Sequence, residues 1–213
     1  MPDEPEAPED DSRLLTALTT EHFALQSMRS TITGESGSRA ALYIGALSSA
    51  LVALAFSGQF EDAFAPFAAA VFPAILVLGV FTYVRLAEIS VEDLHYLHQI
   101  QRIRGYYRGL SPRAAAYFPN EELRSDQALF AAMAIKPRQR FQFLYTAASM
   151  VGAINSIVAG VGAALLLDGA FDVARGASIA VGIVVALAAM ALHGVDEVRR
   201  FARLHATEDT GAA

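Results

Sequence analysis

The stretch FQFLYTAASMVGAINSIVAGVGAALLL, residues Phe141–Leu167, decides the fold class of this protein. It contains no Asp, Glu, Lys, Arg or His. An α-helix rises about 1.5 Å per residue, so roughly 20 apolar residues cross a hydrocarbon core about 30 Å thick. The stretch is long enough to cross a membrane as one helix. It also lacks the alternation of polar and apolar residues that marks a membrane-barrel strand.

Three further runs without Asp, Glu, Lys or Arg lie on either side of it: Ala40–Phe60, Ala63–Val84 and Gly176–Val195. The 213-residue chain is 54% hydrophobic and 18% charged, whereas about a quarter of the residues of a soluble domain are charged. A buried helix of a soluble core rarely stays uncharged for so long, and four in one short chain are rarer still. The sequence therefore predicts an all-α, four-helix transmembrane bundle.

The basic residues divide unequally between the two sides of this predicted bundle. Fifteen of the sixteen precede the first run, lie between the second and third runs, or follow the fourth, and only Arg175 lies in an opposite connection. Arg and Lys are enriched in cytoplasmic segments of membrane proteins. We therefore expect both termini and the long central segment in the cytoplasm. We also expect a bacterial plasma membrane, because lysine occurs only once and alanine is abundant.

The predicted plan has six parts along the chain. They are a disordered acidic tail (1–12), a cytoplasmic amphipathic helix and hinge (13–37), a transmembrane hairpin (38–86), a cytoplasmic helical region (87–140), a second transmembrane hairpin (141–195) and a cytoplasmic tail (196–213). The first eleven residues hold six acids and three prolines, which is typical of a solvated tail. The run Ala40–Phe60 would then be an uncleaved insertion signal.

The segment before the first run has the spacing of an amphipathic helix. Its apolar residues are Leu14, Leu15, Leu18, Phe23, Leu25, Met28 and Ile32. They follow the capping candidates Asp11 and Ser12, so we expect a helix over Arg13–Thr33. The sequence TGESGSR, Thr33–Arg39, is expected to break this helix before the membrane.

The second run is expected to continue as a long cytoplasmic helix to about Leu110, because apolar residues keep helical spacing there. Ser111 and Pro112 have the pattern of a cap followed by proline at the first helical position. Glu121–Ala134 is expected to be helical, and Pro137 marks the approach to the third run.

Small residues recur at four-residue intervals within the predicted spans. The set comprises Gly152, Ser156 and Gly160 in the third run, Gly45 and Ser49 in the first, and Gly182 in the fourth. Small residues let neighbouring backbones approach closely. The pattern favours helix packing, either within one chain or between subunits.

Pro73 and Asn155 are the least ordinary residues of the spans. Proline removes a backbone donor and can kink a helix, so Pro73 is either a gate or a static bend. Asn155 would either line a water path or form a hydrogen bond between helices. Both alternatives remain open for each residue.

The chemistry of the middle of the spans is restricted. No ionisable residue lies there, which argues against proton-coupled transport, voltage sensing and an intramembrane carboxylate catalyst. Glu92, His95 and His98 share one side of a helix, but a dimetal centre would need a second Glu-x-x-His sequence. We find no phosphate loop, dinucleotide motif or nucleophile elbow. We therefore expect no enzyme, no metal and no cofactor.

Arginine and tyrosine concentrate in RIRGYYRGLSPR, residues 102–113. The candidate residues for binding an anionic ligand or lipid are Arg102, Arg104, Tyr106, Tyr107 and Arg108. Guanidinium groups bind phosphate and tyrosine rings stack on bases, although the same arginines also serve simply to hold the segment in the cytoplasm.

Three segments carry a resemblance to known proteins: Glu21–Phe56, VEDLHYLHQIQRIRGYYRGLSP and MVGAINSIVAGVGAALLL. They resemble a family of uncharacterised actinobacterial four-span membrane proteins, which implies an actinobacterial plasma membrane and no particular activity. A helix that leads into a membrane hairpin also looks like the small membrane effectors of nucleotide-signalled antiphage systems.

Three classes of function follow for the chain. The first is a non-enzymatic homo-oligomer that acts as a pore or a signal-responsive effector. The second is a scaffold that presents its cytoplasmic helices to a protein, and the third is a metal enzyme using Glu92 and His95. The expected partners are the bilayer, anionic lipid headgroups, further copies of the chain, and a cytoplasmic protein or nucleotide, but no nucleic acid.

Overall fold

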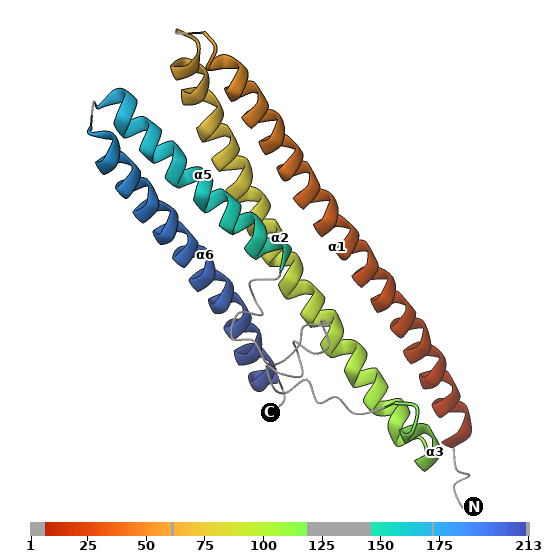
Figure 1. Ribbon diagram of the computed structural model, residues 1–213. Helices are drawn as coiled ribbons and strands as arrows, with labels where there is room; N and C mark the ends of the chain where they lie inside the picture. Colours follow the sequence, from red (N-terminus) through yellow and green to blue (C-terminus); the bar gives the residue numbers. More distant parts are fainter. Residues whose placement is uncertain (1–6, 61, 119–145, 172, 212–213) are drawn as a thin grey trace, which may run out of the picture. The chain divides into compact units, whose positions relative to one another are not determined.

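A computed structural model describes residues 7–60, 62–118, 146–171 and 173–211 of the chain, and every element in them is helical. The helices are α1 (Ala7–Ser57), α2 (Phe64–Gly109), α3 (Pro112–Ala115), α5 (Ala147–Ala170) and α6 (Arg175–Gly211) (Figure 1). The predicted all-α class is confirmed for this part of the chain.

Helices α1, α2, α5 and α6 are each long and apolar enough to cross a membrane. Most of each run expected from the sequence lies in one of these four helices. Residues 58–60, 63 and 146 of the runs lie just outside the helices, and residues 141–145 lie outside the described part. The chain therefore has the helices of a multi-pass membrane protein.

The chain divides into two compact units, to which α1 and α2 both contribute. The helical-pair unit comprises Met1–Gly34 and Glu92–Arg140, and the membrane unit comprises Glu35–Val91 and Phe141–Ala213. All four apolar runs belong to the membrane unit. The polar segments before the first run and after the second supply the helical-pair unit.

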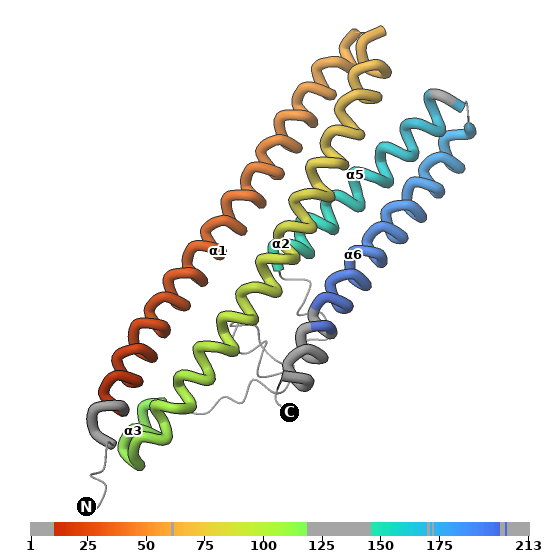
Figure 2. Tube along the Cα trace, turned by 180° about the vertical axis from the view of Figure 1, so that it is seen from behind, coloured from red at the N-terminus to blue at the C-terminus, as the bar shows by residue number. Residues whose placement is uncertain are grey.

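In the membrane unit, α5 lies alongside α6, as both Figure 1 and Figure 2 show. Gly160 and Gly182 face each other in this contact, since a Cβ added to Gly182 would lie 2.6 Å from the Gly160 carbonyl oxygen. The core of the unit joins α1, α2 and α5. Its buried residues are Ala40, Tyr43, Ile75, Tyr83, Leu86, Ala87, Ala148, Val151 and Val158.

In the helical-pair unit, Leu25 of α1 packs against Ile100 and Ile103 of α2. Arg29 fixes the register of the two helices through two hydrogen bonds to Asp93, from Nε at 2.7 Å and from Nη2 at 3.0 Å. A planar guanidinium matches a carboxylate in this two-bond geometry, so the pair adds orientation as well as attraction.

The expected break at Thr33–Arg39 is wrong, because α1 is continuous from Ala7 to Ser57. Each glycine of this stretch costs a helix about 1 kcal/mol relative to alanine. Glu35 offsets this cost by accepting hydrogen bonds from Arg39, one helical turn away, and from Arg85 of α2. The hinge predicted within residues 13–37 is therefore absent.

The predicted start of the first helix is also wrong. Helix α1 begins at Ala7, upstream of Asp11 and Ser12, so part of the expected disordered tail is helical. The sequence at the start of α1 is acidic, and negative charge there interacts favourably with the positive end of the helix dipole.

The extension of the second span is confirmed, since α2 runs to Gly109. The cap is confirmed as well: the Ser111 hydroxyl accepts a hydrogen bond from the Ala114 amide, and Pro112 is the first residue of α3. The helix expected over Glu121–Ala134 and the turn at Pro137 lie outside the described residues.

Candidate functional site

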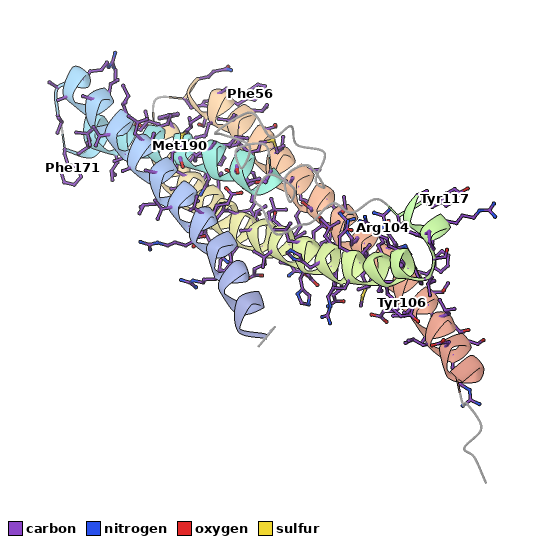
Figure 3. The ribbon with its side chains drawn as sticks, turned by 90° about the horizontal axis from the view of Figure 1, so that it is seen from below. Phe56, Arg104, Tyr106, Tyr117, Phe171 and Met190 are labelled. Carbon is purple, nitrogen blue, oxygen red and sulfur yellow. The ribbon has the colours of Figure 1, made fainter. Side chains whose placement is uncertain are left out.

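The five residues proposed for anion binding occupy different faces of α2. Arg102 and Tyr106, one helical turn apart, line an open groove against α1. Arg104 is exposed and points to the opposite side of α2 from Tyr106 (Figure 3). The structure therefore does not bring the five side chains together into one pocket.

Tyr107 and Arg108 do not line this groove. The Tyr107 hydroxyl is 3.2 Å from the Thr19 hydroxyl of α1, and its ring packs against His22 and Phe118. The Nη1 atom of Arg108 is buried and has no hydrogen-bond partner among the described residues. Tyr107 thus helps to join α1, α2 and the segment after α3.

The Glu92-x-x-His95 sequence forms ordinary polar contacts. Glu92 accepts a hydrogen bond of 2.8 Å from the Tyr96 hydroxyl, and this bond raises the pKa of Tyr96. The Nε2 atom of His95 lies 2.8 Å from the Gln99 amide nitrogen. Over residues 7–60, 62–118, 146–171 and 173–211, no group of three or more His, Asp or Glu residues could hold a metal ion.

The sequence did not predict a polar cluster in the membrane unit whose buried members are Tyr83, Ser149, Ser156 and Glu197. It contains Tyr83 of α2, Thr146, Ser149 and Ser156 at or in α5, and His193, Asp196, Glu197 and Arg200 of α6. The sequence signal was the HGVDEVRR segment together with two hydroxyl residues at the start of α5. Only the pairing of α5 with α6 brings these residues together.

Glu197 is the most deeply buried acid of this polar cluster, with 3% of its surface exposed. Its carboxylate accepts hydrogen bonds of 2.8 Å from Thr146 and 2.6 Å from Ser149. Thr146 is also the N-cap of α5. The carboxyl group therefore lies at the positive end of the α5 dipole, where an acidic side chain interacts favourably with the helix.

His193 and Tyr83 pack against α5 where Gly152 leaves room for them. Their rings meet edge to face with centroids 4.4 Å apart, and a Cβ on Gly152 would lie 3.1 Å from the Tyr83 ring. His193 Nδ1 is 2.8 Å from the Ala189 carbonyl oxygen and 3.2 Å from the Ser156 hydroxyl. A carbonyl only accepts, so Nδ1 carries the proton.

Asn155 lies in the interior of the membrane unit and links three helices. Its Oδ1 accepts a hydrogen bond of 3.3 Å from Tyr43 of α1, and its Nδ2 donates to the Leu76 carbonyl of α2 at 3.5 Å. Gly79 admits the Asn155 amide, because a Cβ at Gly79 would overlap with it. These contacts are the interhelical hydrogen bonds that the sequence left as one of two alternatives.

The remaining residues predicted in the spans lie on the surface. Pro73, expected to be a gate or a static bend, is inside α2 and exposed, and the predicted packing residues Gly45 and Ser49 are exposed on α1. A Cβ on Gly45 would meet no atom within 4 Å. The small residues of α5 and α6 thus pack within the chain, whereas those of α1 face outward.

Glu35 and Arg85 form the main ion pair between α1 and α2 in the membrane unit. Arg85 donates from Nε at 3.0 Å and from Nη2 at 3.1 Å, and Arg39 donates to the same carboxylate at 2.7 Å. These hydrogen bonds, first from Arg85 and then from Arg39, lower the pKa of Glu35 from 4.5 to about 2. Glu35 lies outside the uncharged runs and carries a negative charge at neutral pH.

Comparison with protein-family models, with curated proteins and with solved structures found no match to this chain.

Proposed function

We propose that this protein is a non-enzymatic, signal-responsive effector of the bacterial plasma membrane, in which the helical pair senses a ligand and a homo-oligomer of the membrane unit permits ion flow. The continuity of α1 and α2 carries the proposal. Each helix extends without a break from an apolar run into the helical-pair unit. A continuous ladder of backbone hydrogen bonds can transmit a displacement along a helix.

Ion pairs between α1 and α2 support the coupling in each unit. Arg29 is bound to Asp93 in the helical-pair unit, and Arg85 is bound to Glu35 in the membrane unit, each through two hydrogen bonds. A movement of one helix within a unit would therefore carry its neighbour. The signal itself would be an anionic ligand held at Arg102 and Tyr106, with the helical pair on the cytoplasmic side.

The ion path in this proposal runs between chains. The interior of the membrane unit is occupied by hydrogen-bonded residues such as Asn155 with Tyr43 and Glu197 with Ser149. Apolar side chains cover its outer surface, including Phe56, Phe171 and Met190 (Figure 3). A pore would then form where several membrane units meet.

The experiment is ion flux from liposomes containing the purified full chain. We expect potassium efflux that increases when neutral lipid is replaced by phosphatidylglycerol, the probe for an anionic ligand. The variant Arg102→Gln should reduce this increase, while Arg104→Gln, on the opposite face, serves as the matched control. Absence of potassium efflux in both lipids would overturn the proposal that the protein forms a pore.

A scaffold is the second candidate function, and the open groove of the helical pair favours it. Leu14, Leu18 and Leu25 offer an apolar surface beside Arg102. A cytoplasmic protein that co-purifies in fixed stoichiometry, together with liposomes that show no flux, would support the scaffold over the effector.

A further inference from the structure

The groove of the helical-pair unit has an acidic wall and a basic wall. Leu14 and Glu21 of α1 line one side, and Arg102 and Tyr106 of α2 line the other. Leu25 lies between them and is buried against Ile100 and Ile103. The groove therefore combines an apolar base with two opposite charges.

The sequence of α1 provides two neighbouring columns of residues at seven-residue spacing. Leu18, Leu25 and Ile32 form the first column, in which Leu25 and Ile32 are buried and Leu18 and Leu25 belong to the cluster with Ile100 and Ile103 of α2. Leu14, Glu21 and Met28 form the next column, in which Leu14 is 44% exposed and Met28 is 48% exposed. Together the two columns have the alternating four- and three-residue spacing of one coiled-coil seam, and α2 leaves Leu14 and Met28 of the second column partly exposed.

The second column is only partly covered within the part of the chain that the structure describes. Glu21 and Arg102 form no side-chain hydrogen bond or ion pair with other residues there, and both are exposed. Arg29 and Asp93, by contrast, are paired and fix the register of α1 on α2. The charges of the groove are thus available to a further helix.

Symmetry restricts how a second copy can bind this groove. Two copies of one chain most often meet about a two-fold axis, which makes the contact self-complementary. When two antiparallel helical pairs meet face to face about an axis parallel to their helices, α1 of each copy lies beside α2 of the other. The rotation preserves height along the axis, so Glu21 of one copy would oppose Arg102 of the other.

We propose that this groove binds the same groove of a second copy of the chain, forming a bundle of two helical pairs closed by two Glu21–Arg102 ion pairs. The bundle has the alternating helix directions of an up-down four-helix bundle. The inference goes beyond the proposed function, because assembly through the groove requires neither a ligand nor ion flow. An anionic ligand at Arg102 would compete with Glu21 of the second copy for the same guanidinium group.

The first test reverses the charge at Glu21 or at Arg102 in the full chain and measures dimer formation in detergent. Glu21→Arg and Arg102→Glu each place like charges across the self-paired grooves, so each variant alone should dimerise less than wild type. A mixed dimer of the two variants restores both ion pairs between copies, although each chain then carries like charges within itself. With differently tagged chains, we expect the mixed dimer at least about three-fold above the random ratio.

The outcome separates pairing between copies from pairing within a chain. Random mixing of the two variants would overturn the proposal, and so would a wild-type chain that stays monomeric. Far-UV circular dichroism of both variants shows whether they remain folded. The double variant Glu21→Arg with Arg102→Glu should dimerise with itself as wild type does.

The second test uses the absence of cysteine from the chain. A chain with Glu21→Cys mixed with a chain with Arg102→Cys should form an intermolecular disulfide under mild oxidation. The matched control mixes Phe23→Cys with Arg104→Cys, two exposed positions outside the groove. Equal crosslinking in the control pair would overturn the proposal. A second outcome would also overturn the proposal: the Glu21→Cys variant stays monomeric, yet its thiol does not react with a thiol reagent. In that case a segment of the same chain would fill the groove.

Discussion

At the residue scale, the membrane unit depends on glycines that admit polar groups of neighbouring helices. Gly79 leaves space for the Asn155 amide, and Gly152 leaves space for the Tyr83 and His193 rings. An unsatisfied polar group inside a membrane costs several kcal/mol, so the space and the hydrogen bonds are required together. The glycines therefore control which polar contacts can form.

Gly79→Ala should destabilise the folded protein by about 1–3 kcal/mol, because the new methyl group overlaps with the Asn155 amide. Thermal unfolding in detergent measures the effect. Asn155→Ala in the same chain should recover part of the loss. Gly45→Ala is the control, since open space surrounds that position and alanine favours a helix. Equal destabilisation by both alanines would contradict the packing account.

Glu197→Gln should lower the free energy of unfolding by about 1–3 kcal/mol. Both carboxylate oxygens of Glu197 accept a hydrogen bond, from Thr146 and from Ser149, whereas the glutamine amide has only one oxygen that can accept. Asp196→Asn is the matched comparison. Its side chain is 42% exposed and pairs with Arg200, so the expected loss is smaller. Urea titration of both variants in detergent measures the difference, and a larger loss for Asp196→Asn would count against the buried role of Glu197.

At the element scale, the unbroken α1 shows how side-chain pairing overrides a sequence of poor helix formers. Thr33–Arg39 contains two glycines and two serines, yet Glu35 joins this segment to Arg39 and Arg85. The carboxylate is bound to two cations, which stabilises its charged form. One acidic residue thus contributes both to the helix in this segment and to its local contact with Arg85 of α2.

The stabilisation by Glu35 should vary with pH below 4.5. Its pKa is about 2 in the folded protein and 4.5 without its partners. A lowered folded pKa contributes stability fully above the unfolded value, and that contribution is lost as the pH falls towards 2. The stability difference between wild type and Glu35→Gln should therefore be constant above pH 4.5 and shrink between pH 4.5 and 2. A difference that grows in this window would refute the ion-pair account.

Ser36→Pro should break α1 between its two parts at a cost of about 3 kcal/mol, because proline removes a backbone donor inside the helix. Ser36→Ala is the control and keeps the donor. Limited proteolysis of the chain in detergent should show a new cleavage site near residue 36 only in the proline variant. Cleavage of wild type at the same site and rate would mean that the helix is already open there.

At the scale of the whole molecule, the distribution of charge predicts the orientation in the membrane. The segment Ser57–Asp62 has no basic residue, and the only basic residue near the α5–α6 connection is Arg175, the first residue of α6. With no native cysteine, single substitutions report exposure directly. A thiol reagent that cannot cross the membrane should label Gln59→Cys and Gly176→Cys on intact cells, but Arg104→Cys only after lysis. Labelling of Arg104→Cys on intact cells would show that the chain has the opposite orientation in the membrane.

Hydrophobic length alone determined the number and location of the four apolar helices, because the cost of exposing backbone polar groups to lipid leaves few alternatives to a helix. Helical spacing likewise predicted the extension of α2, and Ser111 with Pro112 predicted the start of α3. The tertiary structure decided the rest. Of the two roles open to Asn155, the structure shows the hydrogen bonds between helices, to Tyr43 and Leu76. Glu197 is buried because α5 packs against α6 at that point. Such contacts join residues far apart in the chain, so local pattern and composition carry no record of them.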